Sequence, residues 1–245
     1  MAPAAAQYSD RMPATAGSIH WWELPRNEIA HNLVLWASYL PLRPSRPVLQ
    51  TLPEDSCIGR VVRSGLRWEG WLTPYLDRFC DPTQVSIDIG ANIGTHTVTM
   101  AERSGHVIAL EPQARVFQAL GSNLAPYANV TLINAGASDH VGTANLDDRA
   151  DGNVGMAAIT PGGEGEEIRL VRIDDLELPG RVAFMKIDAE LHEREVLAGA
   201  QATIARDQPI VIIEDQTDAR STLIDQGYSC RRISLHDFAC LPGTR

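Results

Sequence analysis

Acidic residues follow several apolar segments of this chain, and the first of them stands beside a glycine-rich turn. The stretch 85–94 reads VSIDIGANIG, and its alternating apolar residues predict a buried strand that runs into a turn and a helix. Gly90 and Gly94 allow tight bends and close approach of a ligand. Asp88 places a carboxylate at the strand end, where it can meet a cationic or hydroxylated ligand. An ordinary strand–turn–helix joint is the alternative interpretation.

Charged and polar residues follow the later predicted strands as well. They are Glu111, Ser138 with Asp139, the run Lys186, Asp188, Glu190, His192 and Glu193, and the pair Glu214 and Asp215. Ligands of parallel sheets bind beyond the carboxyl ends of the strands. Glu111 follows the glycine turn by about 20 residues, the spacing at which a carboxylate binds the ribose hydroxyls of a nucleotide cofactor. Acids at so many strand ends on one edge indicate a binding site.

The glycine pattern separates two classes of cofactor. A dinucleotide fold has G-x-G-x-x-G, whose third glycine lets a helix approach the pyrophosphate. This chain has D-x-G-x-N-x-G, with acids around it and no arginine placed for a phosphate. An acidic pocket without a phosphate site suits a ribose joined to a cationic group, and S-adenosylmethionine (SAM) is such a ligand. A nicotinamide-dependent oxidoreductase is the less favoured alternative.

The elements that position these residues alternate between strands and helices. Strands are predicted at 85–89, 106–110, 130–134, 182–187, 210–213 and 228–233, and helices at 92–104, 113–124, 193–205 and 217–226. A hairpin-like insertion at 143–173 contains a glycine-rich loop at 147–165. The alternation predicts an α/β, doubly wound, Rossmann-like fold, with a mostly parallel seven-stranded sheet and helices on both faces.

The residues before this core are predicted to form a separate region. Residues 1–18 are rich in Ala, Pro and Ser and predict disorder, residues 19–80 predict a helical extension, and residues 81–245 form the core. Within the extension, helices are predicted at 27–40 and 67–79, and a short strand at Val61 and Val62. The adjacent Trp21 and Trp22 suit core packing first, with a pocket cap or a homodimer contact as alternatives.

Three stretches resemble the FkbM-type methyltransferase family, a group of class I SAM-dependent enzymes. They read SIDIGANIGTHTVTMA, VIALEPQARVFQALGSNL and FMKIDAELHEREVLAGA, and the likeness covers roughly residues 60 to 240. The usual form of the last motif in that family is close to K-I-D-x-E-G-x-E. This chain keeps Lys186, Asp188, Glu190 and Glu193 but has Leu191 at the glycine position.

The resemblance implies O-methylation of a hydroxyl on a small molecule, such as a polyketide, a glycoside or another natural product. The cofactor residues that it implies are Asp88, Gly90, Ala91, Asn92 and Gly94 for the methionine part, Glu111 for the ribose, and Ser138 and Asp139 for the adenine end. A SAM-binding protein without catalytic activity is the alternative that Leu191 leaves open.

Methyl transfer from a sulfonium is an in-line displacement, so alignment of the acceptor oxygen matters most. An alcohol must also lose its proton, which calls for a base. Lys186 and Asp188 are two residues apart at a strand end and so face the same side. We expect Asp188 to contact cofactor and acceptor, with Lys186 steadying its charge. Glu190 and His192 are the candidate bases, since a neutral imidazole is available near pH 7.

Three further groups have weaker claims to the site. His96 follows the glycine turn and is expected to line the start of a helix. Glu69 lies in the WEGW stretch, which is similar to a family position just before the core, and is expected to reach the pocket. The pair at 236–237, a histidine and an aspartate, is interpreted as a surface turn because no nucleophile motif accompanies it. Oxygen ligands for Mg²⁺ could come from Asp188, Glu190, Glu214 and Asp215, but nothing in their spacing demands a metal, and none is favoured.

Bulk properties exclude several classes of partner. The net charge is −10, and its acids are mixed with Lys and Arg, so a nucleic-acid partner is not expected. No apolar run reaches the roughly 18 residues of a membrane span. The 4 cysteines, at 57, 80, 230 and 240, lie far apart and form no C-x-x-C pair, which predicts reduced thiols in a cytoplasmic protein.

Overall fold

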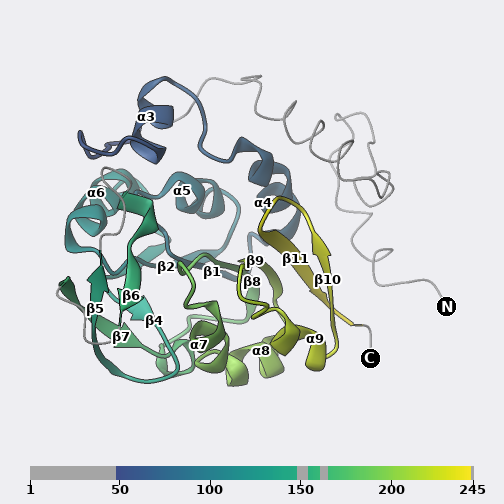
Figure 1. Ribbon diagram of the computed structural model, residues 1–245. Helices are drawn as coiled ribbons and strands as arrows, with labels where there is room; N and C mark the ends of the chain where they lie inside the picture. The colour runs from purple at the N-terminus through teal and green to yellow at the C-terminus, as the bar shows by residue number, and fades with distance from the viewer. Residues whose placement is uncertain (1–47, 148–153, 161–164, 244–245) are drawn as a thin grey trace, which may run out of the picture.

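The computed structural model describes residues 48–147, 154–160 and 165–243, and these form two sheets with helices around the larger one (Figure 1). The larger sheet contains β1 (Val85–Ile89), β2 (His106–Leu110), β3 (Val130–Ile133), β8 (Val182–Ile187), β9 (Ile210–Glu214), β10 (Tyr228–Arg232) and β11 (Asp237–Pro242). Its strand order is β10-β11-β9-β8-β1-β2-β3. β11 pairs antiparallel with both of its neighbours, whereas the other pairs in this sheet are parallel. The predicted mostly parallel seven-stranded sheet is therefore confirmed.

Helices cover both faces of this sheet, as a doubly wound fold requires. The helices are α3 (Ile58–Arg63), α4 (Thr73–Phe79), α5 (Thr95–Ala101), α6 (Ala114–Leu124), α7 (Glu193–Ala198), α8 (Gln201–Asp207) and α9 (Ser221–Asp225), with 3-10 turns η3 (Gly70–Leu72), η4 (Val154–Met156) and η5 (Ile173–Asp175). In β2, Ile108 and Leu110 pack in one core with α7 to α9, whereas Val107 and Ala109 pack in another with α4 to α6. Successive strand residues face opposite sides of the sheet, so one apolar strand contributes side chains to both cores.

The insertion after β3 folds into a sheet of its own. Its strands are β4 (Gly136–Ala137), β5 (Gly142–Asp147), β6 (Ala158–Thr160) and β7 (Glu166–Val171), in the order β4-β7-β5-β6. The glycine-rich stretch predicted as loop thus contains η4 and β6, because residues 158–160 pair with 145–147 of β5. Leu146, Ala157, Ile168 and Leu170 form a small apolar core beneath it.

Two predicted elements differ from the structure for local reasons. The predicted strand at Val61 and Val62 is part of α3, because the buried carboxylate of Asp55 accepts the backbone N–H groups of Cys57 (2.9 Å) and Gly59 (2.7 Å) and so starts a helix. The predicted helix at 193–205 is split into α7 and α8. The Asp174 carboxylate accepts the N–H groups of residues 202 and 203, at 2.9 and 2.8 Å, and starts the second helix.

The interpretation of residues 236–237 as a surface turn was wrong for Asp237. Asp237 begins β11 and lies directly across from Glu214 of β9. The residues that follow it pair with β9, and Phe238, Ala239 and Cys240 among them are buried. β11 thus lies between β9 and β10 in the sheet. The predicted helix at 27–40 and the pair Trp21 and Trp22 lie outside the described residues.

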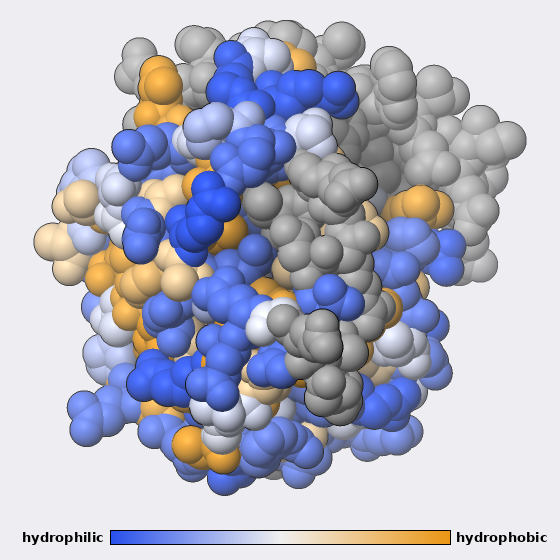
Figure 2. Space-filling model, turned by 60° about the vertical axis from the view of Figure 1, so that its left-hand side comes forward, coloured by the Kyte–Doolittle hydropathy of each residue, from blue (hydrophilic) through white to orange (hydrophobic). Residues whose placement is uncertain are grey.

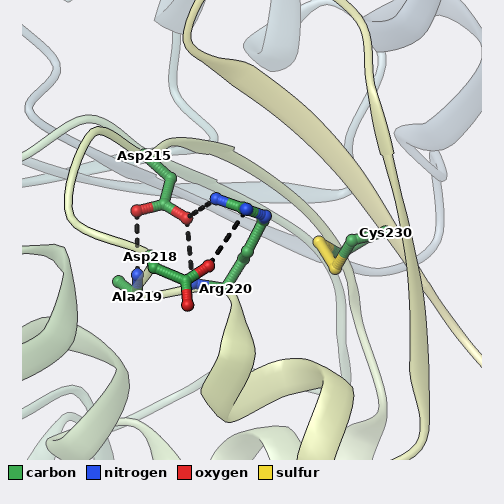
Figure 3. Close-up of a disulfide and its surroundings, with 6 residues drawn as sticks. Asp215, Asp218, Ala219, Arg220 and Cys230 are labelled. Carbon is green, nitrogen blue, oxygen red and sulfur yellow. Dashed lines mark hydrogen bonds and ion pairs between the residues drawn. A yellow bond between two sulfur atoms is a disulfide. The ribbon is translucent and has the colours of Figure 1, made fainter.

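The prediction of four reduced cysteines was also wrong, because Cys230 and Cys240 form a disulfide (Figure 3). These two residues pair directly across β10 and β11, with their Cα atoms 4.0 Å apart. Cys57 and Cys80 are free thiols. Beside the disulfide, the carboxylate of Asp215 binds the guanidinium of Arg220 at 2.7 Å and the N–H of Ala219 at 2.8 Å. Asp215 therefore starts α9.

We expect the disulfide to stabilise the edge of the sheet. It closes a loop of 10 residues, and constraint of the unfolded chain by a loop of that size contributes about 2 to 3 kcal/mol. Reductant should lower the urea midpoint of the wild-type protein, whereas a variant with both Cys230→Ala and Cys240→Ala should unfold at one midpoint with or without reductant. Equal midpoints for oxidised and reduced wild type would contradict this expectation.

In the ranges 48–147, 154–160 and 165–243, few large apolar side chains are exposed. Figure 2 shows a face made mostly of hydrophilic residues, with apolar ones in small groups. The exposed large apolar residues are Val48, Leu66, Val141, Met156, Leu191, Ile224 and Leu235. Among the described residues, no helix combines the length and the apolar character needed to cross a bilayer.

Candidate functional site

A cavity of about 240 Å³ opens at the carboxyl ends of β1, β2 and β8 and against the small sheet. Its polar lining residues include Glu69, Asn92, His96, Glu111, Lys186, Asp188, Glu190, His192 and Glu214. This is the edge at which ligands of such sheets bind. Of the predicted cofactor residues, Gly90, Ala91, Asn92 and Glu111 line the cavity, as do all four predicted catalytic residues.

Gly90 makes the closest backbone contact of the site. Its φ angle is +76°, and a Cβ atom placed on it would lie 1.8 Å from the carbonyl oxygen of Asp188. The N–H groups of Gly90 and Ala91 both donate to the carbonyl of Leu110, at 3.1 and 2.9 Å. The turn after β1 is therefore held between the ends of β2 and β8, and only glycine fits at position 90.

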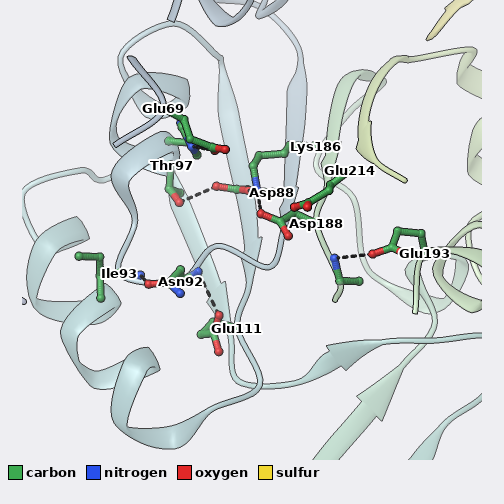
Figure 4. A network of polar contacts seen from close by, with 12 residues as sticks. Glu69, Asp88, Asn92, Ile93, Thr97, Glu111, Lys186, Asp188, Glu193 and Glu214 are labelled. Carbon is green, nitrogen blue, oxygen red and sulfur yellow. Dashed lines mark hydrogen bonds and ion pairs between the residues drawn. The ribbon is translucent and has the colours of Figure 1, made fainter. Parts of the chain in front are cut away.

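Glu111 is buried at the end of β2 and is tied to the same turn. One carboxylate oxygen accepts the N–H of Asn92 at 3.0 Å, and the other accepts the N–H of Gln113 at 2.9 Å (Figure 4). Burial raises the pKa of Glu111 to about 7, although the two N–H groups oppose that shift. The carboxylate is fixed in one position beside the cavity, as a group that binds two ribose hydroxyls must be.

Asp88 lies beneath the turn and does not line the cavity. It is fully buried, and its Oδ2 accepts the hydroxyl of Thr97 at 2.7 Å. Its Oδ1 has no hydrogen-bond partner among the described residues and lies 3.9 Å from Nζ of Lys186. Lys186 also donates to Asp188 at 3.0 Å, so one buried ammonium joins the ends of β1 and β8 (Figure 4). Thr97 had not been singled out, and only its spacing of nine residues from Asp88 hints at the contact.

The far end of the cavity is an apolar slot. It is lined by Leu110, Ala135, Gly136, Ala137, Leu146, Met156, Ala157 and Ile159, so the small sheet forms one of its walls. Ser138 and Asp139 are not among the lining residues. Ser138 is fully buried with its hydroxyl 3.0 Å from Nε2 of His192, and Asp139 binds exposed His140 at 2.6 Å. A flat apolar base would therefore contact residues 135–137 and the small sheet.

The sequence model of the Methyltransferase FkbM domain matches residues 88–230, which is more than half of the chain. The chain belongs to the FkbM methyltransferase family. The match begins at Asp88 and includes the glycine turn, Glu111 and the segment from Lys186 to Glu193. The resemblance stated from these motifs is confirmed, and SAM is the cofactor that the family implies.

Solved and curated relatives are more distant. Methyltransferase FkbM from Methylobacillus flagellatus KT aligns with a TM-score of 0.50 at 15% identity, over 87% of this chain and 59% of that one, which supports the fold. An rRNA methylase from Streptococcus thermophilus aligns with a TM-score of 0.44 at 13% identity, over 72% and 96%. Ribosomal RNA small subunit methyltransferase A of Bacillus mycoides is 39% identical over 67 residues, which are 25% of this chain and 23% of that protein. The match thus spans about a quarter of that curated relative.

The residues of this FkbM domain fit the SAM that the family implies. Gly90 brings a backbone turn without a side chain to the cavity wall, Glu111 offers a buried carboxylate, and the slot by residues 135–137 is apolar. These three features follow one another along the edge of the sheet in the order β1, β2, β3. The sulfonium, the ribose and the adenine of SAM follow one another in the same order.

Carboxyl groups crowd the other end of the cavity, beyond β8. Burial and then the charge of Asp188 raise the pKa of Glu190 to about 7 and that of Glu214 to about 9. Burial, followed by Glu69 and Asp188, raises the pKa of Asp237 to about 7. For Asp188 itself, burial opposes ionisation, but the ammonium of Lys186 keeps its pKa below the ordinary value. Asp188 thus stays ionised, whereas the neighbouring carboxyl groups hold their protons to higher pH than usual.

These shifts predict that the ligand-free protein loses stability from pH 5 to pH 9. Each raised carboxyl binds a proton in the folded state that the unfolded chain has already released, so unfolding is favoured as the pH rises. For Glu111, Glu190 and Asp237 the window runs from the ordinary value near 4 to about 7, and for Glu214 it extends to about 9. Thermal unfolding across this range checks the sign. A melting temperature that rises with pH would contradict it.

His192 precedes α7 and faces away from the carboxyl cluster. Nε2 lies 3.0 Å from the Ser138 hydroxyl, and Nδ1 lies 3.6 Å from Glu195. Burial lowers the pKa of His192, which keeps the imidazole neutral near pH 7. Glu193 is buried, and its carboxylate accepts the N–H groups of residues 189 and 191, at 3.2 and 3.1 Å. Glu193 therefore holds the turn that presents Glu190.

Leu191 occupies that turn in a conformation that suits glycine. Its φ angle is +74°, a left-handed conformation that is unfavourable for leucine. Because Leu191 is 50% exposed, burial of its side chain offsets little of that cost. Leu191→Gly should raise the free energy of unfolding by about 1 kcal/mol. Leu235→Gly, at an exposed site with no positive φ, is the matched control and should lower it. Loss of stability in both variants would contradict the account of this turn.

A metal site is not formed by the described residues, in which no group of three or more His, Cys, Asp or Glu could hold an ion. Asp215, one of the four oxygen ligands considered, is turned toward α9 by its contacts with Arg220 and Ala219.

Proposed function

We propose that this FkbM methyltransferase transfers the methyl group of SAM to a hydroxyl of a small molecule, a natural product such as a polyketide or a glycoside. The observation that carries the proposal is the carboxyl cluster of Asp188, Glu190 and Glu214 beside the buried Lys186. An alcohol must lose its proton when it attacks, and this end of the cavity offers several carboxyl groups close to the glycine turn. SAM supplies an electrophilic methyl group on a sulfonium.

Asp188 is suited to accept a hydrogen bond from the acceptor hydroxyl. The Nζ of Lys186 holds it at 3.0 Å and keeps it ionised. Glu190 is the candidate base, since its pKa of about 7 lets it take a proton near neutral pH. His192 is the second candidate, because burial keeps it neutral, although its Nε2 already contacts Ser138.

A small acceptor is favoured over RNA by the charge of this end of the site. The curated Bacillus relatives are named for ribosomal RNA, but nucleic-acid binding needs a clustered basic face. Here the carboxyl groups of Asp188, Glu190 and Glu214 surround a single lysine, and the chain carries a net charge of −10. A phosphate backbone would be repelled at the mouth of the cavity.

The test is mass spectrometry of reactions with SAM and a panel of hydroxylated polyketides, glycosides and phenols. A product heavier by one methylene group, with the methyl on oxygen, supports the proposal. Glu190→Gln should then lower kcat by about 100-fold or more at pH 7, and His192→Gln by less. Methylation of nitrogen or of ribosomal RNA would contradict the proposal, and SAM binding without transfer to any acceptor would favour a non-catalytic protein.

A further inference from the structure

Glu69 brings a carboxylate to the cavity from before the stretch that the family model matches, which begins at Asp88. One of its oxygens lies 2.9 Å from Nε2 of His96, near the start of α5. Both residues line the cavity close to the glycine turn, and His96 is 8% exposed. In the part of the chain that the structure describes, no hydrogen bond reaches the second oxygen of Glu69. That oxygen is free to accept a donor from a ligand.

The backbone at Glu69 is held in an unfavourable conformation. Its φ and ψ angles are 45° and 46°, in the left-handed region that a residue with a side chain rarely adopts. The next residues fix it there: Trp71 and Leu72 are 2% and 1% exposed, in the same apolar core as Ala91 and Val98. Local strain kept by rigid surroundings is typical of residues that serve a site.

The order of groups along the sheet edge indicates what Glu69 meets. The apolar slot lies by residues 135–137 after β3, Glu111 ends β2, and Gly90 follows β1. The next positions in the strand order belong to β8, with Lys186 and Asp188, and Glu69 interacts with the charge of Lys186. The parts of SAM follow one another as adenine, ribose, sulfonium and amino acid tail. If the base and ribose lie at β3 and β2, the tail must lie near β8.

The tail carries an ammonium group, and a carboxylate that faces the cavity would bind it with a charge-assisted hydrogen bond. Asp88 does not face it, since Asp88 is fully buried and bound to Thr97. Asp188, Glu190 and Glu214 also face it. Asp188 is already paired with Lys186 at 3.0 Å, and burial beside Asp188 raises the pKa values of Glu190 to about 7 and of Glu214 to about 9, which disfavours their ionised forms near neutral pH. Glu69 faces it, has no lysine or arginine within ion-pair distance among the described residues, and lies beside the glycine turn.

We infer that Glu69 binds the ammonium group of the methionine tail of SAM, with His96 positioning its carboxylate. The segment before the family domain thus completes the cofactor site. This inference rests on the cofactor of the proposed function. His96 acts through Glu69, so His96→Gln, whose amide can still donate to that carboxylate, should retain more SAM affinity than His96→Ala.

The test is isothermal titration of wild type and Glu69→Gln with SAM, S-adenosylhomocysteine and methylthioadenosine, which lacks the amino acid tail. The variant should bind the first two roughly 10- to 100-fold more weakly, the effect of losing one charge-assisted hydrogen bond. Its affinity for methylthioadenosine should be unchanged. Glu69→Gly relieves the backbone strain, so it should melt no lower than wild type and yet show the same loss.

Glu102→Gln is the matched control. Glu102 follows α5, its carboxylate binds Arg103 at 2.8 Å outside the cavity, and its replacement should leave all three affinities unchanged. An equal loss for all three ligands in Glu69→Gln, or no loss for any, would overturn the inference. A wild-type protein that binds no SAM would instead overturn the proposed function together with it.

Discussion

Gly90→Ala is expected to weaken SAM binding at least about 100-fold and to lower the free energy of unfolding by roughly 2 to 4 kcal/mol. The added Cβ would lie 1.8 Å from the carbonyl oxygen of Asp188, and the φ angle of +76° disfavours any side chain. To relieve the clash, the end of β1 must separate from the end of β8. That movement would displace Asp188 and the turn that lies beside Glu111 at the cavity wall. Titration with SAM and urea unfolding measure the two effects.

Gly121→Ala is the matched control for this prediction. Gly121 lies within α6, and a Cβ placed on it would meet only Leu132, at 3.9 Å. Alanine also favours a helix over glycine, so this variant should be slightly more stable and should bind SAM as the wild type does. Normal SAM affinity in Gly90→Ala would mean that the cofactor does not lie against this turn.

Lys186→Met is expected to destabilise the protein by about 3 to 5 kcal/mol, the usual cost of removing one partner from a buried ion pair. The ammonium is 5% exposed and lies 3.9 Å from Asp88 and 3.0 Å from Asp188. Burial alone would lower the pKa of Lys186, but these two carboxylates raise it above the ordinary value, so the group is always charged. Without it, two buried carboxylates lack a counter-charge.

The loss in Lys186→Met should depend on pH. The carboxyls left behind acquire raised pKa values, so the folded state binds protons that the unfolded chain releases, and stability falls as the pH rises. The variant should therefore be nearer to wild type at pH 5 than at pH 8. Adding Asp188→Asn to Lys186→Met should recover part of the lost stability, because it removes one buried carboxylate that has no counter-charge. Arg206→Met, which breaks an ion pair on a half-exposed arginine, should cost about 1 kcal/mol or less. A pH-independent loss would contradict this role of Lys186.

The strand ends were predictable from the sequence because their signal is local. Apolar alternation placed Asp88, Glu111 and Lys186 at the ends of β1, β2 and β8, and the parallel topology then brought them to one edge. The turn at Gly90 was predictable for the same reason, since glycine and asparagine adopt positive φ angles more readily than other residues and so mark tight turns.

The features that the sequence did not predict depend on contacts between segments far apart in the chain, and local residue patterns do not reveal such contacts. β11 was missed, so Asp237 was assigned to a turn and the Cys230–Cys240 pairing could not be expected. The small sheet joins β4 to β7, so its part in the apolar slot, in place of Ser138 and Asp139, was not visible in the sequence. Glu69 lines the cavity as expected, but its contact with His96 was not predicted, because it depends on the packing of Trp71 and Leu72 in the core.

We assign the cavity beside Gly90 and Glu111 to SAM. Isothermal titration of the full chain with SAM and with NADH tests this assignment. We predict one SAM per chain, no measurable NADH binding, and a SAM affinity that Glu111→Gln lowers by roughly tenfold or more. Absence of SAM binding, tighter binding of NADH, or an unchanged SAM affinity in Glu111→Gln would contradict this assignment of the site.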